Sequence, residues 1–301
     1  MEPYRYGKAR RLHNNLKAML YNELPIAFPW YDKIEKQNRF NEHTTGVCDY
    51  QLISPADALL PFQFYKQPIG SVLPNLWEVF EANSQVKVAD ITSNIPLLFK
   101  VVREGREYFC YHGDKLQNMA LPAGYFYSRM VFPDGTIFFS EMFHVPESFF
   151  YIGNDTNIQF LKLSWYNNSD VRPIFYNNLD GQGVPKFKNV LYLDTFIHAS
   201  EPEITEDGTR DGNDELITTF QKVVIPYRIT LAVPDFVKKA LCVMPLHSTI
   251  RVVTKQGVRD GLLEAVKINT ALEASGALSV IDILFYSDIA IVKKGCADNM
   301  V

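Results

Sequence analysis

The fold of this chain is decided by the stretch Leu121-Pro-Ala-Gly-Tyr-Phe-Tyr-Ser-Arg-Met-Val-Phe-Pro-Asp-Gly-Thr-Ile-Phe-Phe-Ser-Glu-Met-Phe143. Two segments rich in aromatic and β-branched residues, 125–132 and 136–143, flank Pro133-Asp-Gly135. Because glycine adopts φ > 0 without a Cβ clash, Asp-Gly between such segments is the strongest short-range signal for a β-hairpin. The stretch therefore predicts a hairpin. Short β-prone runs separated by turn residues continue along the rest of the chain.

The composition is that of a folded protein without a nucleic-acid-binding surface. At 301 residues, with 47% hydrophobic and 21% charged residues, the chain can bury a sizeable core and is long enough for two domains. A formal net charge of −4 offers no basic footprint for sequence-specific nucleic-acid binding. The 21 Phe and 16 Tyr are typical of β-rich cores and of protein–protein interfaces.

The cysteines and the N-terminal sequence indicate where the chain is made. The four cysteines are far apart and form no C-x-x-C pair: Cys48, Cys110, Cys242 and Cys296. We expect free thiols that pack as small buried hydrophobes. The first thirty residues lack the layout of a signal peptide, and no apolar run approaches the roughly 20 residues that span a bilayer. We therefore expect cytoplasmic synthesis and no membrane insertion.

Residues 8–24 are predicted to form a helix that ends before Pro25. Its single apolar stripe contains Leu12, Leu16, Met19, Leu20 and Leu24, at the spacing of one helical face. Two interpretations stay open: the helix docks on a neighbouring subunit, or it packs on its own domain. A membrane-surface helix is disfavoured because its basic residues are few. Leu12, Leu16, Met19 and Leu20 are candidate subunit-contact residues.

The rest of the chain predicts a mainly β protein with tandem antiparallel β-sandwich-like domains. We place an N-terminal helical arm and linker at 1–45, one sandwich domain at 46–147 and a second β-rich domain at 148–301. The second domain holds one short helix, 236–244, with Asp235 as its N-cap. Pro226 lies within a strand of period two and is expected at a sheet edge or a bulge. The predicted strands are 47–53, 60–65, 76–80, 86–91, 97–102, 107–111, 157–166, 185–194, 221–232, 248–254, 261–268 and 277–286.

Residues 201–215 carry seven acidic residues against one arginine. Such a segment cannot be a core strand, so we predict a solvent-exposed acidic loop. The segment 207–212 superficially resembles a calcium loop, but its twelfth position is Thr218, which cannot supply the bidentate carboxylate that an EF-hand needs. We expect no metal here. The candidate subunit-contact residues of this loop are Glu206, Asp207, Arg210 and Asp211.

The sequence offers no catalytic cluster. The six histidines are scattered, and the chain lacks a nucleophile elbow, a P-loop and a dinucleotide fingerprint. Glu141, between Phe139 and Phe143, is the one carboxylate that we weigh for a sugar-binding cleft, although a half-exposed sheet residue is the simpler interpretation. We therefore expect no catalytic residue and no cofactor.

A family resemblance rests on the succession of several segments. Residues 30–38 (WYDKIEKQN) precede 51–63 (QLISPADALLPFQ), and the hairpin at 124–143 follows. Then come 161–169 (LKLSWYNNS), 190–195 (VLYLDT) and the acidic 206–212 (EDGTRDG). This order, from about residue 30 to 286, resembles structural tail proteins of tailed phages that infect Bacteroidetes. The resemblance implies a distal-tail-like subunit of a tail hub, ring or baseplate in the virion. It further implies a homo-oligomeric ring, six-fold or a multiple, that contacts other tail proteins and carries no catalytic residues.

Three functions from different classes follow. The first is a non-enzymatic virion structural protein, whose ring needs head-to-tail contacts repeated by rotation. The second is a carbohydrate-binding or adhesive module that recognises host surface glycans. The third, a glycan-degrading enzyme, needs a pair of carboxylates in a groove.

Overall fold

The structure is a computed structural model, and it confirms a mainly β protein with several sheets. The predicted helix with Leu12, Leu16, Met19 and Leu20 lies outside the described residues. The division into domains near residue 147 stays a prediction. The structure describes residues 27–32, 52–66, 70, 72–103, 106–147, 160–166, 187–195, 198–199, 201, 203–210, 213, 216–224, 226–247, 249–254, 257–269, 278–287 and 291–294.

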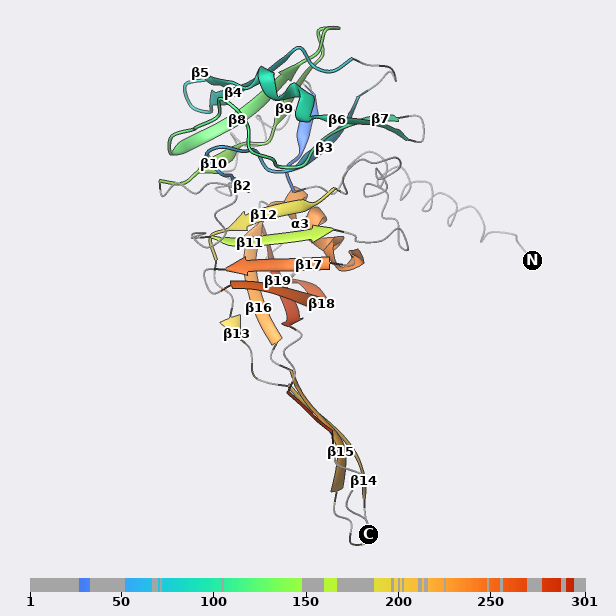
Figure 1. Ribbon diagram of the computed structural model, residues 1–301. Helices are drawn as coiled ribbons and strands as arrows, with labels where there is room; N and C mark the ends of the chain where they lie inside the picture. The colour runs from blue at the N-terminus through green and yellow to red at the C-terminus, as the bar shows by residue number, and fades with distance from the viewer. Residues whose placement is uncertain are drawn as a thin grey trace, which may run out of the picture.

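One large sheet runs through the molecule (Figure 1), and two three-stranded sheets accompany it. Strand β4 (Leu76–Glu81) pairs with β8 (Gly124–Val131) of the large sheet, and β5 (Lys87–Asp90) pairs with β4. The order along its main path is β1 (Trp30–Asp32), β9 (Ile137–Ser140), β8 (Gly124–Val131), β10 (Phe143–Val145), β2 (Leu52–Ile53), β12 (Asn189–Leu193), β11 (Leu161–Tyr166), β17 (Thr249–Thr254), β18 (Gly257–Asn269), β19 (Ser279–Ser287), β16 (Pro226–Val233) and β13 (His198–Ala199).

The predicted hairpin is confirmed as β8 and β9. Gly135 lies at φ 83°, in the left-handed region that favours glycine, and its N–H donates to the carbonyl of Phe132 at 2.9 Å. The second half of the hairpin is shorter than predicted, because the strand stops at Ser140 and resumes as β10. Strand β9 pairs with the C-terminal end of β8, whereas β10 pairs with its N-terminal end. The interruption lets both short strands share one edge of β8 while β4 occupies the other.

A layer of aromatic side chains joins the large sheet to the small sheet of β3 (Phe62–Lys66), β7 (Arg106–Tyr111) and β6 (Phe99–Arg103). Trp30 of β1 packs on Phe62 with ring centroids 4.6 Å apart, and Phe138 of β9 stacks on Phe64 at the same separation. Aromatic pairs of this kind contribute about 0.5–1.5 kcal/mol beyond the area they bury. Close ring contacts from β1 and β9 therefore hold this part of the large sheet against the small sheet.

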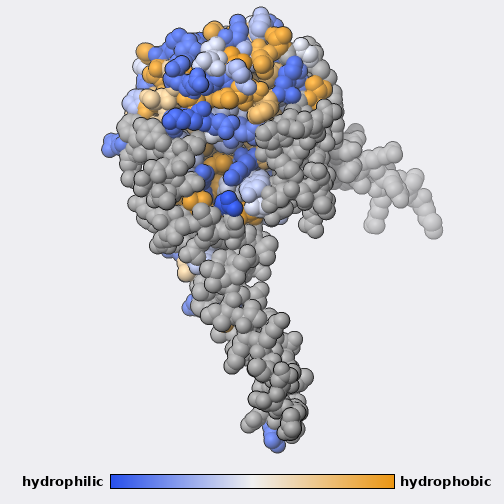
Figure 2. Space-filling model, in the orientation of Figure 1, coloured by the Kyte–Doolittle hydropathy of each residue, from blue (hydrophilic) through white to orange (hydrophobic). Residues whose placement is uncertain are grey.

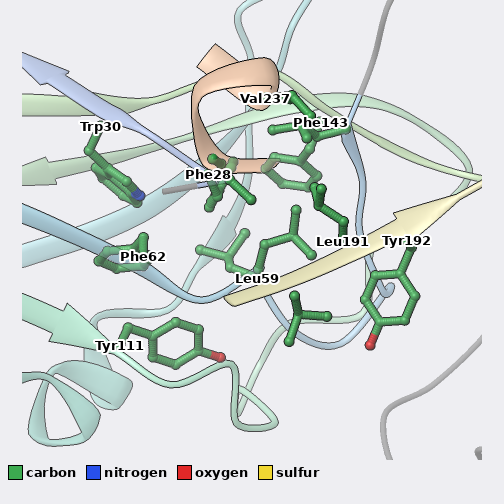
Figure 3. Packing of buried hydrophobic residues seen from close by; sticks show 14 of the residues in the cluster. Phe28, Trp30, Leu59, Phe62, Tyr111, Phe143, Leu191, Tyr192 and Val237 are labelled. Carbon is green, nitrogen blue, oxygen red and sulfur yellow. The ribbon is translucent and has the colours of Figure 1, made fainter. Parts of the chain in front are cut away.

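One hydrophobic core continues from these strands into the later half of the chain (Figure 3). Strands β2 and β12 connect the two halves of the large sheet through the pair Ile53 and Tyr192. The helix α3 (Asp235–Cys242) contributes Val237 to the same cluster of buried residues as Phe28 and Phe143. We call all described elements outside residues 203–224 and 291–294 the body. Most of its buried hydrophobic residues belong to one core, and Tyr108 and Cys110 form a small separate cluster.

The later strands follow the predicted alternation, with two corrections. In β16, Ile229, Leu231 and Val233 are buried while the residues between them are exposed, as period two requires. The predicted strand 221–232 corresponds to two strands, β15 (Leu216–Val224) and β16, and Pro226 begins β16. The predicted cap of α3 is wrong: Asp235 is the first helical residue, and its carboxylate pairs with Lys239 at 2.9 Å.

Candidate interaction surfaces

A narrow three-stranded sheet, here called the β-arm, leaves the body at the end of the large sheet (Figure 1). It consists of β14 (Glu203–Arg210), β15 and β20 (Ile291–Lys294) in the order β14-β15-β20. At about 3.3 Å per residue, nine-residue β15 extends about 30 Å. The chain passes from β13 into β14, from β15 into β16 and from β19 into β20. Because β13, β16 and β19 pair in this same order, the β-arm prolongs the last three strands of the body.

The β-arm corrects the prediction of an acidic loop at 201–215. Residues 203–210 form a strand, because the neighbouring β15 sequence LITTFQKVV is strongly β-prone and pairs with them along their whole length. Glu206 lies opposite Gln221, Asp207 opposite Phe220 and Arg210 opposite Leu216. The register shifts between Asp207 and Gly208, as in a β-bulge. Asp211 lies outside the described residues.

The pairing of β14 with β15 is unlike the geometry of an EF-hand calcium loop. An EF-hand loop curls around its ion between two helices, whereas residues 207–210 are extended in a sheet. Within the described part of the chain, no group of three His, Cys, Asp or Glu residues is placed to hold a metal ion.

The two outer strands of the β-arm differ in charge. Among the described strands, β14 pairs with β15 alone, and so does β20. The sequence of β14 carries Glu203, Glu206 and Asp207 against Arg210, three negative charges and one positive, a net of −2. The sequence of β20 carries Lys293 and Lys294 and no acidic residue, a net of +2. The β-arm thus presents one acidic and one basic strand edge.

A second candidate surface is the outward face of β4, β5, β8 and β9. Arg129 donates to Glu78 Oε2 at 2.6 Å and lies over the ring of Phe80, 4.5 Å from its centroid. Lys87 reaches the other oxygen of Glu78 at 3.3 Å. Phe80 stacks on Tyr127 at 5.4 Å. The charged side chains and the rings of this face therefore hold one another in place.

Exposed apolar side chains lie at the two ends of β4. Val72, Leu73 and Leu76 are at its start, and Val86 with Tyr125 are at its other end, where the N–H of Ala82 donates to the carbonyl of Tyr125. On the face that Figure 2 shows, apolar and hydrophilic residues are interspersed over this upper part of the body. Small separate groups of this kind are ordinary on a protein surface and do not by themselves indicate a partner.

The turn of the hairpin is held by a buried lysine. Lys66 of β3 has a side chain only 2% exposed, and its ammonium group donates to Asp134 at 2.5 Å. This hydrogen bond, with help from the backbone N–H of Thr136, lowers the pKa of Asp134 to about 2. The Lys66 ammonium also lies 5.3 Å from the ring centroid of Phe132. The contact between Lys66 and Asp134 links the small sheet to the hairpin of the large sheet. No sequence pattern predicts it, because the two residues are 68 positions apart.

Glu141 makes structural contacts between strands. It is buried between β9 and β10, not half-exposed on a strand as expected, and it accepts a hydrogen bond from Tyr31 at 3.1 Å. Its own N–H donates to the carbonyl of Pro29 at 3.0 Å. Glu141 therefore secures β1 to the interruption in the hairpin.

His247 and the two described cysteines differ in their surroundings. His247 follows α3 and contacts the carbonyls of Val243 and Met244 through Nδ1, and burial lowers its pKa to about 4. Cys110 is free and buried, as predicted, and burial raises the pKa of its thiol. The prediction of burial is wrong for Cys242, which is free and exposed at the end of α3.

Comparisons with known proteins leave the function to be argued from this geometry. No protein-family model matches the chain, and neither a curated protein nor a solved structure matches it. Of the helices in the described ranges, none is long and apolar enough to cross a membrane.

Proposed function

We propose that this protein is a non-enzymatic structural subunit of a phage tail, part of a hub, ring or baseplate that assembles through protein–protein contacts. The observation that carries the proposal is the β-arm, which extends from the body and has two outer strands, β14 and β20. A narrow sheet about 30 Å long outside the core has outer strands with which a neighbouring chain can pair. In an assembly, such an arm can contact the neighbouring subunit.

The construction of the body supports this role. Its core is continuous from Phe28 and Phe143 to α3, so a load applied through the β-arm reaches packed strands. The buried side chains that sequence reasoning weighed for chemistry make structural contacts, as Glu141 does with Tyr31. The proposal accordingly assigns no catalytic residue and no cofactor.

The tail assignment comes from the order of sequence segments between about residues 30 and 286, which resembles Bacteroidetes phage tail proteins. It entails assembly in the host bacterial cytoplasm, a place in the virion tail, other tail proteins as partners and a ring that is six-fold or a multiple. It also entails tandem antiparallel sandwich-like domains preceded by an N-terminal helix. The aromatic contacts between the β3-β7-β6 sheet and the hairpin support the sandwich arrangement of the first domain.

The test is the native mass of the purified full chain over a wide range of concentrations. The proposal predicts a discrete ring whose mass is six times that of the 34.5 kDa chain, or a multiple of six times. A chain that stays monomeric over the whole range would contradict self-assembly.

A second candidate function, glycan binding, is favoured by one observation. Tyr125 is exposed on β8 and stacks on His144 at 4.8 Å, so its ring is held in place and available to pack on a sugar. A polysaccharide array probed with the wild-type chain and with Tyr125→Ala tests this function. Binding that disappears with the ring would favour it, and absence of binding by the wild type would reject it.

A further inference from the structure

The β-arm offers two strand edges that can pair with strands of another chain. An outer strand has a row of backbone N–H and C=O groups that its own sheet leaves unpaired, and such an edge adds strands readily. In the described part of the β-arm, β14 and β20 are the outer strands and β15 is central. The question is therefore which strand each edge accepts.

Charge disfavours pairing between identical edges. If two copies met through β14, two strands of net charge −2 would lie side by side, with Glu206 and Asp207 on each. If they met through β20, Lys293 and Lys294 of one copy would lie beside the same two lysines of the other copy. Like charges across an interface are strongly unfavourable, so neither two-fold arrangement is expected. The opposite edges, β14 of one copy and β20 of the next, attract each other.

Strand direction then fixes the geometry of this contact. β14 is antiparallel to β15, and β15 is antiparallel to β20, so β14 and β20 run in the same direction. When neighbouring β-arms point the same way, β20 of one copy meets β14 of the next as a parallel pair. A contact between two different surfaces of the same chain is heterologous and closes into a ring when the rotation between copies permits.

We infer that copies of this protein join head to tail through the β-arm, with the acidic edge strand β14 of one copy pairing with the basic edge strand β20 of the next. The partner is a second copy of this chain, and the recognition combines backbone hydrogen bonds with opposite charge. This inference deepens the proposed function and rests on it. It names the contact through which the proposed ring is held.

The experiment reverses the charge of each edge and then of both together. The variants Lys293→Glu/Lys294→Glu and Glu206→Lys/Asp207→Lys each place like charges at the contact. We expect each to raise the concentration needed for assembly by about a hundredfold. The four substitutions combined exchange the two edges and should restore assembly to the wild-type concentration.

A matched control and a second measurement make the result specific. Lys222→Glu changes charge on the central strand β15 and should assemble like the wild type. Circular dichroism confirms that each variant is folded. The wild type itself supplies an independent test, because added salt screens opposite charges and should raise its assembly concentration.

The failures are distinguishable. If the wild type assembles but the edge variants assemble equally well, or if the combined variant stays dissociated, the edge contact is wrong and the proposed function stands. Assembly of the wild type that is unaffected by salt also overturns the edge contact. If the wild type is monomeric at every concentration, the proposed function fails and the contact fails with it.

Discussion

The interruption in the hairpin, between β9 and β10, is held together by two buried serines, and removing one of them should destabilise the protein by a predictable amount. Ser128 has no strand partner on the edge of β8 that β9 and β10 share, and its N–H donates instead to Oγ of Ser140 at 2.8 Å. The Ser140 hydroxyl donates in turn to the carbonyl of Glu141 at 2.8 Å. Ser128 and Ser140 are 0% and 3% exposed, so water cannot replace these partners in the folded state. The side chain of Ser140 thus takes the place of a ladder hydrogen bond.

Substitution Ser140→Ala removes this acceptor and leaves the N–H of Ser128 buried without it. An orphaned buried donor costs about 1–3 kcal/mol, and the lost oxygen leaves almost no cavity. We expect the free energy of unfolding to fall by about 2 kcal/mol. The assay is equilibrium unfolding in urea, followed by tryptophan fluorescence. Trp77 reports locally because its indole N–H donates to Oγ of Ser128 at 3.0 Å.

A control and a coupling measurement complete the test. Ser93→Ala, at an exposed position of the short 3-10 helix η1 (Thr92–Leu97), should change the free energy of unfolding by no more than about 0.5 kcal/mol. Ser128→Ala and Ser140→Ala belong to one network and should be non-additive when combined. The reasoning is refuted if Ser140→Ala unfolds with the same free energy as the exposed control.

Three further predictions concern the core and its titratable groups. In the folded chain the pKa of His247 is about 4, whereas in the unfolded chain it is about 6.5, so below pH 6.5 the unfolded chain binds a proton there more readily. The free energy of unfolding therefore falls as the pH falls, by about 2 kcal/mol at pH 5. His247→Gln should remove this loss, in urea unfolding of the wild type and the variant compared at pH 7 and pH 5. Phe143→Ala should cost about 3–5 kcal/mol of unfolding free energy, because the ring is fully buried in the core; a smaller loss than about 1 kcal/mol would show that the core there is loosely packed. With the other two cysteines replaced by serine, a thiol reagent should label Cys242 at pH 8 and leave Cys110 unlabelled until the chain unfolds; equal labelling of both would contradict the burial of Cys110.

The sequence predicted those parts of the fold that depend on local pattern. Asp134-Gly135 between aromatic segments identified the hairpin, and alternation identified β11 and β16. Helix α3 was found from its apolar spacing, but its cap was not, because a carboxylate before an apolar run looks alike as a cap or as the first helical residue. Local pattern carries no information on which distant strands pair. Only the structure therefore shows the pairing of β2 with β12 at Ile53 and Tyr192 and the ion pair between Lys66 and Asp134.

The β-arm shows the same limit of prediction from local sequence pattern. The acidic composition of 201–215 predicts a loop where the structure has a strand, because residues 203–210 lack the apolar alternation of a strand that covers a core. A strand in a narrow arm needs only a β-prone neighbour, and β15 is one. The residues chosen there, Glu206, Asp207 and Arg210, lie on the outer strand of the β-arm, whereas Asp211 lies outside the described residues.

The measurement that tests the central claim most directly is electron microscopy of the assembled wild-type chain. Class averages should show closed rings in which neighbouring subunits touch through their β-arms. Rings in which the bodies alone touch while the β-arms stand apart, or fields of single particles at every concentration, would contradict the account.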